Sequence, residues 1–165
     1  MSRRGAGKVS PSTKTLLHAS SDEKFAFTHA NQRHSSYKRA LVPVRTRRWN
    51  DRRLPGDGLR LLICRYRPRG VRKSDETWDE WDPDLGPSRE LHAAVYGKSG
   101  PPISWEQYRP RYLGEMKARE KRIEELASRV RAGETITLLC SSACVDDARC
   151  HRSLLRELIE SAVGP

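Results

Sequence analysis

Two short runs of mainly apolar residues stand out in a chain that is otherwise rich in charged residues. One covers residues 59–64 and the other residues 135–140, and both place apolar side chains at consecutive positions. Such runs are typical of strands that are covered on both faces. A shorter run at residues 41–45 contains Pro43, which cannot donate a ladder hydrogen bond. We therefore expect this third strand at an edge of the sheet.

Between and after these runs, apolar residues recur at the spacing of helices. Ser88 and Ser104 are expected N-caps, and Gln107 stands where a capping box needs it. The predicted helices cover residues 89–96, 105–117 and 121–131, and a final helix opens at residue 149 or 150. A further short helix is expected from residue 73, and it would contain Trp78 and Trp81.

Strands that alternate with helices predict an α/β fold with right-handed crossovers. We expect a small three-layer domain, with a mostly parallel sheet flanked by helices, over residues 40–161. Residues 1–39 are rich in Ser, Lys, Arg and His and show no sustained apolar period. They predict a flexible basic arm. Residues 162–165 are expected to form a short tail.

The charge balance narrows the expected partners. The 165-residue chain has a formal net charge of +11 and a pI of about 10.0. Such a balance favours phosphate-bearing small molecules or nucleic acid, although a basic tail on an ordinary soluble domain is an equally simple explanation. No apolar stretch approaches the length of a membrane span, and the N-terminus lacks the apolar core of a signal peptide. These features predict a cytoplasmic protein without a membrane partner.

The first apolar run leads directly into a cluster of arginines, Arg65, Arg67 and Arg69. Open α/β sheets bind ligands just beyond the carboxyl ends of their strands. A guanidinium group offers a planar fork of donors that matches phosphate and carboxylate oxygens. The cluster therefore predicts an anion-binding site. The alternative is internal pairing of these arginines with acidic residues such as Asp82 or Glu115.

Three of the four cysteines fall within residues 140–150. Cys140 ends a predicted strand, and Cys150 opens the final helix. A helix N-terminus attracts anions and lowers the pKa of a thiol. Cys150 is therefore a candidate catalytic thiolate, with His151 and Arg152 beside it as candidate anion-binding residues.

Two other roles remain open for these cysteines. Cys140, Cys144, Cys150 and His151 would supply four soft metal ligands. Their spacing lacks a Cys-x2-Cys knuckle, and adjacent residues 150 and 151 do not easily chelate one ion, so we expect no metal site. In the second alternative the cysteines only pack, since a buried cysteine behaves as a small apolar side chain.

Four segments of the chain also carry a family resemblance. The matching residues are Arg65, Pro68, Arg69, Gly70 and Val71, then Trp81, Leu85, Pro87, Ser88 and Leu91, then Arg111, Tyr112 and Glu115, and finally Cys150, His151 and Arg152. In these segments the chain, from about residue 41 to residue 160, resembles the domain of unknown function 488 family in its YeaO-like branch. Cys64 and Arg67 depart from the family pattern, which has aspartate and tryptophan there. The resemblance implies a domain defined by sequence and structure, not by a reaction.

The expected site is a positive cleft where the strands that end at Cys64 and Cys140 lie side by side. Within it, Glu115 is a candidate acid or base, three residues from Tyr112 on one helix face, or a partner for Arg69. The favoured function is an enzyme that acts on a phosphate-bearing or nucleotide-like substrate. The alternative is a non-enzymatic nucleic-acid-binding protein. No Walker, dinucleotide-binding or metalloprotease motif identifies a cofactor.

Overall fold

The computed structural model describes residues 44–164. Four strands form one sheet in the order β1-β4-β2-β3, and every pair of neighbours is parallel. The strands are β1 (Arg45–Arg48), β2 (Leu59–Leu62), β3 (Glu80–Trp81) and β4 (Ile136–Cys140). The expected parallel α/β fold is confirmed. The first strand lies at an edge, as expected, but it covers Arg45–Arg48 and not residues 41–45, of which 41–43 lie outside the described residues. The arm predicted at residues 1–39 lies outside the described residues.

The helices begin close to their predicted caps. They are α1 (Arg89–Val95), α2 (Trp105–Lys117), α3 (Glu120–Arg131) and α4 (His151–Val163), with 3-10 turns η1 (Lys73–Asp75) and η2 (Pro83–Leu85). The Ser88 hydroxyl accepts a hydrogen bond from the Leu91 amide, and Ser104 and Gln107 form a complete capping box. These side chains satisfy amides that a helix start leaves without partners, and so they define where α1 and α2 begin. No helix in the described range is long and apolar enough to cross a membrane.

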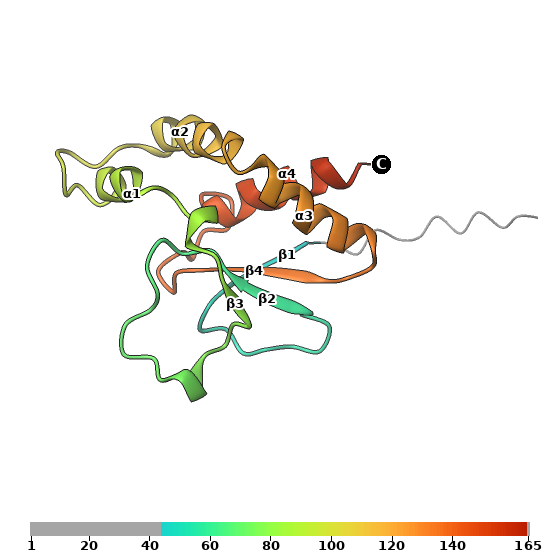
Figure 1. Cartoon of the computed structure of the whole chain (residues 1–165). Coiled ribbons are helices and arrows are strands. Elements are labelled where there is room, and N and C mark those ends of the chain that lie inside the picture. Colours follow the sequence, from blue (N-terminus) through green and yellow to red (C-terminus); the bar gives the residue numbers. More distant parts are fainter. Residues whose placement is uncertain (1–43, 165) are drawn as a thin grey trace, which may run out of the picture. The chain divides into compact units, whose positions relative to one another are not determined.

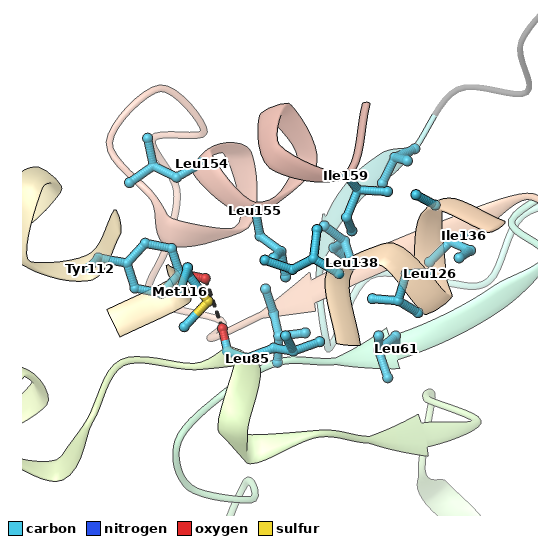
Figure 2. Close-up of a cluster of buried hydrophobic side chains, with 14 of the residues drawn as sticks. Leu61, Leu85, Tyr112, Met116, Leu126, Ile136, Leu138, Leu154, Leu155 and Ile159 are labelled. Atoms are coloured by element: carbon cyan, nitrogen blue, oxygen red, sulfur yellow. Dashed lines mark hydrogen bonds between the residues drawn. The ribbon is translucent and has the colours of Figure 1, made fainter. Parts of the chain in front are cut away.

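The main core lies between the sheet and the helices, which cover one side of it (Figure 1). Leu61 and Leu138 on neighbouring strands pack with Leu126 of α3 and with Leu155 and Ile159 of α4, as Figure 2 shows. Side chains of alternate strand positions point to the opposite face. There a second, smaller apolar cluster forms around Leu62, Leu139 and Trp78.

The helix expected to contain Trp78 and Trp81 is absent, and a short edge strand takes its place. Only the single turn η1 is helical there, and Glu80–Trp81 pairs with β2. The Asp79 amide donates to the Arg60 carbonyl at 2.8 Å, and the Asp82 amide donates to the Leu62 carbonyl at 2.9 Å. The prediction was wrong because the exposed edge of β2 supplies backbone partners that a local sequence pattern cannot reveal.

A buried ion pair lies on the face of the sheet away from the helices. The Arg60 side chain in β2 is fully buried, and its Nη1 lies 2.9 Å from Oδ2 of Asp57, which is also buried. Arg47 donates to the same carboxylate at 3.2 Å, and the Leu54 amide donates to it at 3.0 Å. The Asp57 backbone carbonyl in turn accepts the Thr137 hydroxyl at 2.6 Å. This network ties the loop before β2 to three strands.

Protonation of the Asp57 carboxylate is expected to account for part of the stability that the fold loses in acid. Burial raises the pKa of Asp57, but the hydrogen bond from the Leu54 amide and the charges of Arg47 and Arg60 outweigh it, so this pKa lies below its usual range. Such a group stabilises the fold above its unfolded-state pKa, and the contribution is lost as pH falls through the folded-state value. We expect the difference in unfolding free energy between the native chain and Asp57→Asn to be constant above about pH 5 and to shrink below about pH 4. Urea titrations across this pH range measure the difference in unfolding free energy. A difference that persists unchanged to about pH 2 would contradict a lowered pKa at Asp57.

Candidate functional site

A cleft of about 550 Å³ opens at the carboxyl end of the sheet. Leu62 of β2 lies opposite Leu139 of β4, and the Ile63 amide donates to the Leu139 carbonyl at 3.0 Å. The strands that lead to Cys64 and Cys140 therefore end side by side, as expected. Segments far apart in sequence then line the same cleft, including residues 64–66 and 68–69, the first turn of α2 and the loop between β4 and α4.

Three arginines line this cleft: Arg65, Arg69 and Arg149. Arg65 lies 3.6 Å from a carboxylate oxygen of the half-exposed Asp84, and Arg149 lies 3.9 Å from one of Asp146. Arg69 is exposed and forms no ion pair within residues 44–164. The cleft thus carries cationic groups that are held loosely or not at all by protein carboxylates.

Two of the predicted anion-binding residues, Arg67 and Arg152, do not line the cleft. Arg67 pairs with the buried carboxylate of Glu76, and its guanidinium lies 5.9 Å from the centre of the Trp78 ring. Arg152 is buried, and its Nε donates to Asp147 at 2.7 Å. Both are occupied by internal contacts of the kind that the sequence left open as an alternative.

Glu115 also lies outside the lining of the cleft. Its Oε2 accepts a hydrogen bond of 2.9 Å from the backbone amide of Ser88, the N-cap of α1. It therefore holds α1 against α2. The pairing with Arg69 that the sequence suggested does not form.

Aromatic rings form a wall that runs from the cleft toward the core. Trp105 stacks on Tyr108 at 5.5 Å between ring centres, and Tyr108 stacks on Tyr112 at 5.9 Å. The Tyr112 hydroxyl donates to the Leu85 carbonyl at 2.8 Å, the dashed contact in Figure 2. Tyr112 in turn lies 5.5 Å from the ring of His151. The spacing of Tyr108 and Tyr112 allows them to share a helix face, but no pattern in the sequence shows that Trp105 and Tyr108 face the site.

His151 lies on the same cleft as Arg69, as expected, but its surroundings do not give it a positive charge. Its Nε2 donates to the Ile63 carbonyl at 3.1 Å, and its ring lies 3.6–3.8 Å from the Cys140 sulfur. Burial lowers the pKa of His151. The imidazole is therefore neutral near neutral pH and acts as a positioned ring beside the sulfur.

Three cysteine sulfurs form a cluster on the cleft. The sulfurs of Cys140, Cys144 and Cys150 all lie within 4.8 Å of one another, and those of Cys140 and Cys144 are 3.4 Å apart. Hydrogen bonds from the Cys140 and Cys150 thiols lower the pKa of Cys144 to about 3. The hydrogen bond with Cys140 lowers the pKa of Cys150, but the contact with Cys144 and burial outweigh it and raise this pKa to about 12. The contacts within the cluster thus favour Cys144, in the loop, as the thiolate over Cys150, the residue that the sequence suggested.

Comparison with known proteins identifies the family of this chain. The model of the active DUF488-N3 subclade matches residues 44–163. The chain belongs to the DUF488 family. It is 36% identical over 86 residues to the uncharacterized protein YeaO of Escherichia coli (strain K12), an alignment that covers 52% of this chain and 71% of YeaO. It is 29% identical over 107 residues to the uncharacterized protein Rv3073c of Mycobacterium tuberculosis (strain H37Rv), covering 64% of this chain and 83% of that protein. No solved structure gives a significant match.

The segments that carry the DUF488 resemblance meet at the cleft. Arg65 and Arg69 come from the first segment, Pro87 from the second, and Cys150 and His151 from the last, and all five line it. The third segment lies behind it, where Tyr112 supports the His151 ring. The cleft is therefore the candidate site of this DUF488-family chain.

Proposed function

We propose that this DUF488-family chain is an enzyme that binds a phosphate-bearing, nucleotide-like substrate in the cleft at the carboxyl end of the sheet. One observation carries the proposal: a single cleft combines guanidinium donors, stacked aromatic rings and a cluster of thiols. Each element suits a different part of such a substrate. Its volume of about 550 Å³ falls within the range of small-molecule sites, roughly 300–1,000 Å³.

The arginines supply the phosphate subsite. Arg69 has no carboxylate partner within the described range. The ion pairs of Arg65 and Arg149, at 3.6 and 3.9 Å, are long and have solvent-exposed carboxylates, so they contribute little to stability. A phosphate group can therefore take these guanidinium donors at small cost and accept charge-assisted hydrogen bonds from them.

The aromatic wall supplies the subsite for the ring. Trp105 and Tyr108 line the cleft and stack on each other, so they present flat apolar surface at a fixed angle. Stacking of a base on such a surface contributes about 1–3 kcal/mol and does not require a particular base. Because the cysteine sulfurs lie on the same cleft, a bound substrate comes next to groups that can act as nucleophiles or ligands.

Calorimetric titration of the full chain with ADP, adenosine and pyrophosphate tests the binding step. We expect ADP to bind more tightly than either fragment, because only ADP fills both subsites. Arg69→Ala should weaken ADP binding about tenfold or more, the effect of losing a charged hydrogen bond. Lys121→Ala removes the same charge from the exposed face of α3, outside the cleft, and should leave binding unchanged. Equal losses in both variants would contradict a phosphate subsite at Arg69.

The alternative is a non-enzymatic protein that binds nucleic acid, which the net charge of +11 favours. Binding through many backbone phosphates weakens steeply as salt rises, whereas a nucleotide in a cleft makes few such contacts. Affinities for ADP and for a single-stranded oligonucleotide, measured at low and high salt, separate the two. Mass spectrometry of nucleotides incubated with the chain then tests turnover. Tight, salt-sensitive oligonucleotide binding without any nucleotide product would favour the alternative.

A further inference from the structure

We infer that Cys140, Cys144 and Cys150 together bind one soft divalent metal ion, of which zinc is the natural example, and that the remaining coordination position faces the cleft. The sequence spacing argued against a metal, yet the fold brings the three sulfurs together. The inference concerns the cysteine cluster alone, so it holds or fails independently of the proposed nucleotide substrate.

The distances between the sulfurs fit a site for a single ion. Zinc–sulfur bonds of about 2.3 Å in a tetrahedron place the sulfurs ~3.8 Å apart. The sulfurs of Cys140 and Cys144 are 3.4 Å apart, and all three sulfurs lie within 4.8 Å of one another. A four-iron cluster holds its cysteines farther apart, because several irons and sulfides separate them. Thiolates select thiophilic ions such as zinc over magnesium or calcium.

The backbone around the cluster is fixed without a ligand. Cys140 is the last residue of β4, and Cys150 is the N-cap residue of α4. The loop between them is tied down, since the Cys144 amide donates to the Ser141 carbonyl at 3.1 Å and the Ser153 hydroxyl donates to the Asp147 carbonyl at 2.6 Å. A strand end, a helix start and a tethered loop thus present the three sulfurs together, which reduces the ordering that metal binding requires.

The surrounding charge suits a metal–thiolate centre. Three thiolates and one divalent ion carry a net charge of −1. Arg152 is buried next to them, and its guanidinium interacts electrostatically with Cys150 and Cys140. Its Nη1 is buried and has no hydrogen-bond partner among residues 44–164. The N-terminus of α4, which has no side-chain cap, adds the positive end of the helix dipole. A buried donor without a partner is costly in the absence of a negative centre.

The fourth coordination position opens to the cleft. All three cysteines line the cleft, and within residues 44–164 the group of ligand atoms that lie within 4.8 Å of one another contains these three sulfurs but neither Cys64 nor His151. The imidazole is instead held by the Ile63 carbonyl at 3.1 Å. Three protein ligands with one open position are typical of catalytic zinc sites, whereas structural sites are closed by four.

Metal binding to the reduced full chain tests the inference. The chain is reduced with a phosphine, incubated with excess zinc and dialysed to remove unbound metal. We then expect one zinc ion per chain, measured by inductively coupled plasma mass spectrometry. Cobalt should give intense visible d–d bands and a sulfur-to-metal charge-transfer band, the signature of a tetrahedral thiolate site. Cys140→Ser, Cys144→Ser and Cys150→Ser should each weaken zinc binding by about a hundredfold or more, because a hydroxyl is a much poorer zinc ligand than a thiolate.

Cys64→Ser is the matched control, because Cys64 lines the same cleft but lies outside the cluster. It should keep the full zinc content and the cobalt spectrum. Loss of zinc in this variant would overturn the assignment of three ligands and an open position. Absence of stoichiometric zinc from a chain that circular dichroism shows to be folded, with all four thiols titratable, would overturn the metal site itself. Either result leaves the nucleotide titrations to be judged separately.

Discussion

Asp57→Asn is expected to lower the free energy of unfolding by about 3–5 kcal/mol, the cost of breaking a buried ion pair by removing one partner. The substitution keeps the size of the side chain but leaves the Arg60 guanidinium buried without its counter-charge. Arg60 has no exposed surface, and its Nη1 lies 2.9 Å from Asp57. Its Nε has no hydrogen-bond partner within residues 44–164, and its remaining contact, from Nη2 to the Asp51 carbonyl at 2.8 Å, supplies no counter-charge. Urea unfolding followed by circular dichroism measures the loss.

Glu124→Gln is the control for this prediction. It removes a carboxylate that pairs with Arg131 on the surface of α3, where both side chains are well exposed. Exposed pairs contribute up to about 1 kcal/mol, so this variant should stay within that range. If Asp57→Asn lowered the free energy of unfolding as little as Glu124→Gln, water would have to reach Arg60. The network on the face of the sheet away from the helices would then not stabilise the fold.

The sequence was sufficient to predict the elements whose signals are local. The apolar runs located β2 and β4, and the capping residues Ser88 and Ser104 located the starts of α1 and α2. Strand β3 was missed because its formation depends on the free edge of β2, about twenty residues away. Arg60 was hidden within an apolar run, and nothing local shows that its partner is Asp57.

The position of the cleft could be predicted from the sequence, but not all of the residues that line it. Parallel pairing of β2 with β4 follows from the fold class and brings Arg69 and Cys150 to one cleft. Arg65, Arg67 and Arg69 form one cluster in the sequence, yet all three lie beyond the end of β2, and the chain there directs Arg67 to Glu76. Cys144 was visible in the sequence as one of four candidate soft ligands, but its place beside Cys140 depends on how the loop folds back, which no local pattern shows.

The second large effect is expected just before the amino end of β2, where Gly58→Ala should lower the free energy of unfolding by about 3 kcal/mol or more. Gly58 has φ +61°, a left-handed conformation that costs another residue roughly 1–2 kcal/mol. A Cβ placed there would lie 2.0 Å from the backbone oxygen of Thr135, and relieving such overpacking costs about 1–3 kcal/mol more. The same oxygen accepts the Leu59 amide at 2.9 Å, the hydrogen bond that starts the pairing of β2 with β4. Thermal and urea unfolding measure the change.

Gly114→Ala provides the control, because it makes the same chemical change within α2. Its φ is ordinary and nothing lies within 4 Å of the added Cβ, so alanine should stabilise the helix by about 0.5–1 kcal/mol. We expect the free energy of unfolding to fall in Gly58→Ala and to rise in Gly114→Ala.

Gly58→Ala should also affect the site, since the paired strands hold Cys64 and Cys140 side by side at the cleft. Gly58→Ala should therefore also weaken the proposed binding of zinc and nucleotide at temperatures below its unfolding transition, although residue 58 does not line the cleft. Unchanged binding in a destabilised Gly58→Ala chain would show that the carboxyl ends of β2 and β4 keep their register independently of where the pairing begins.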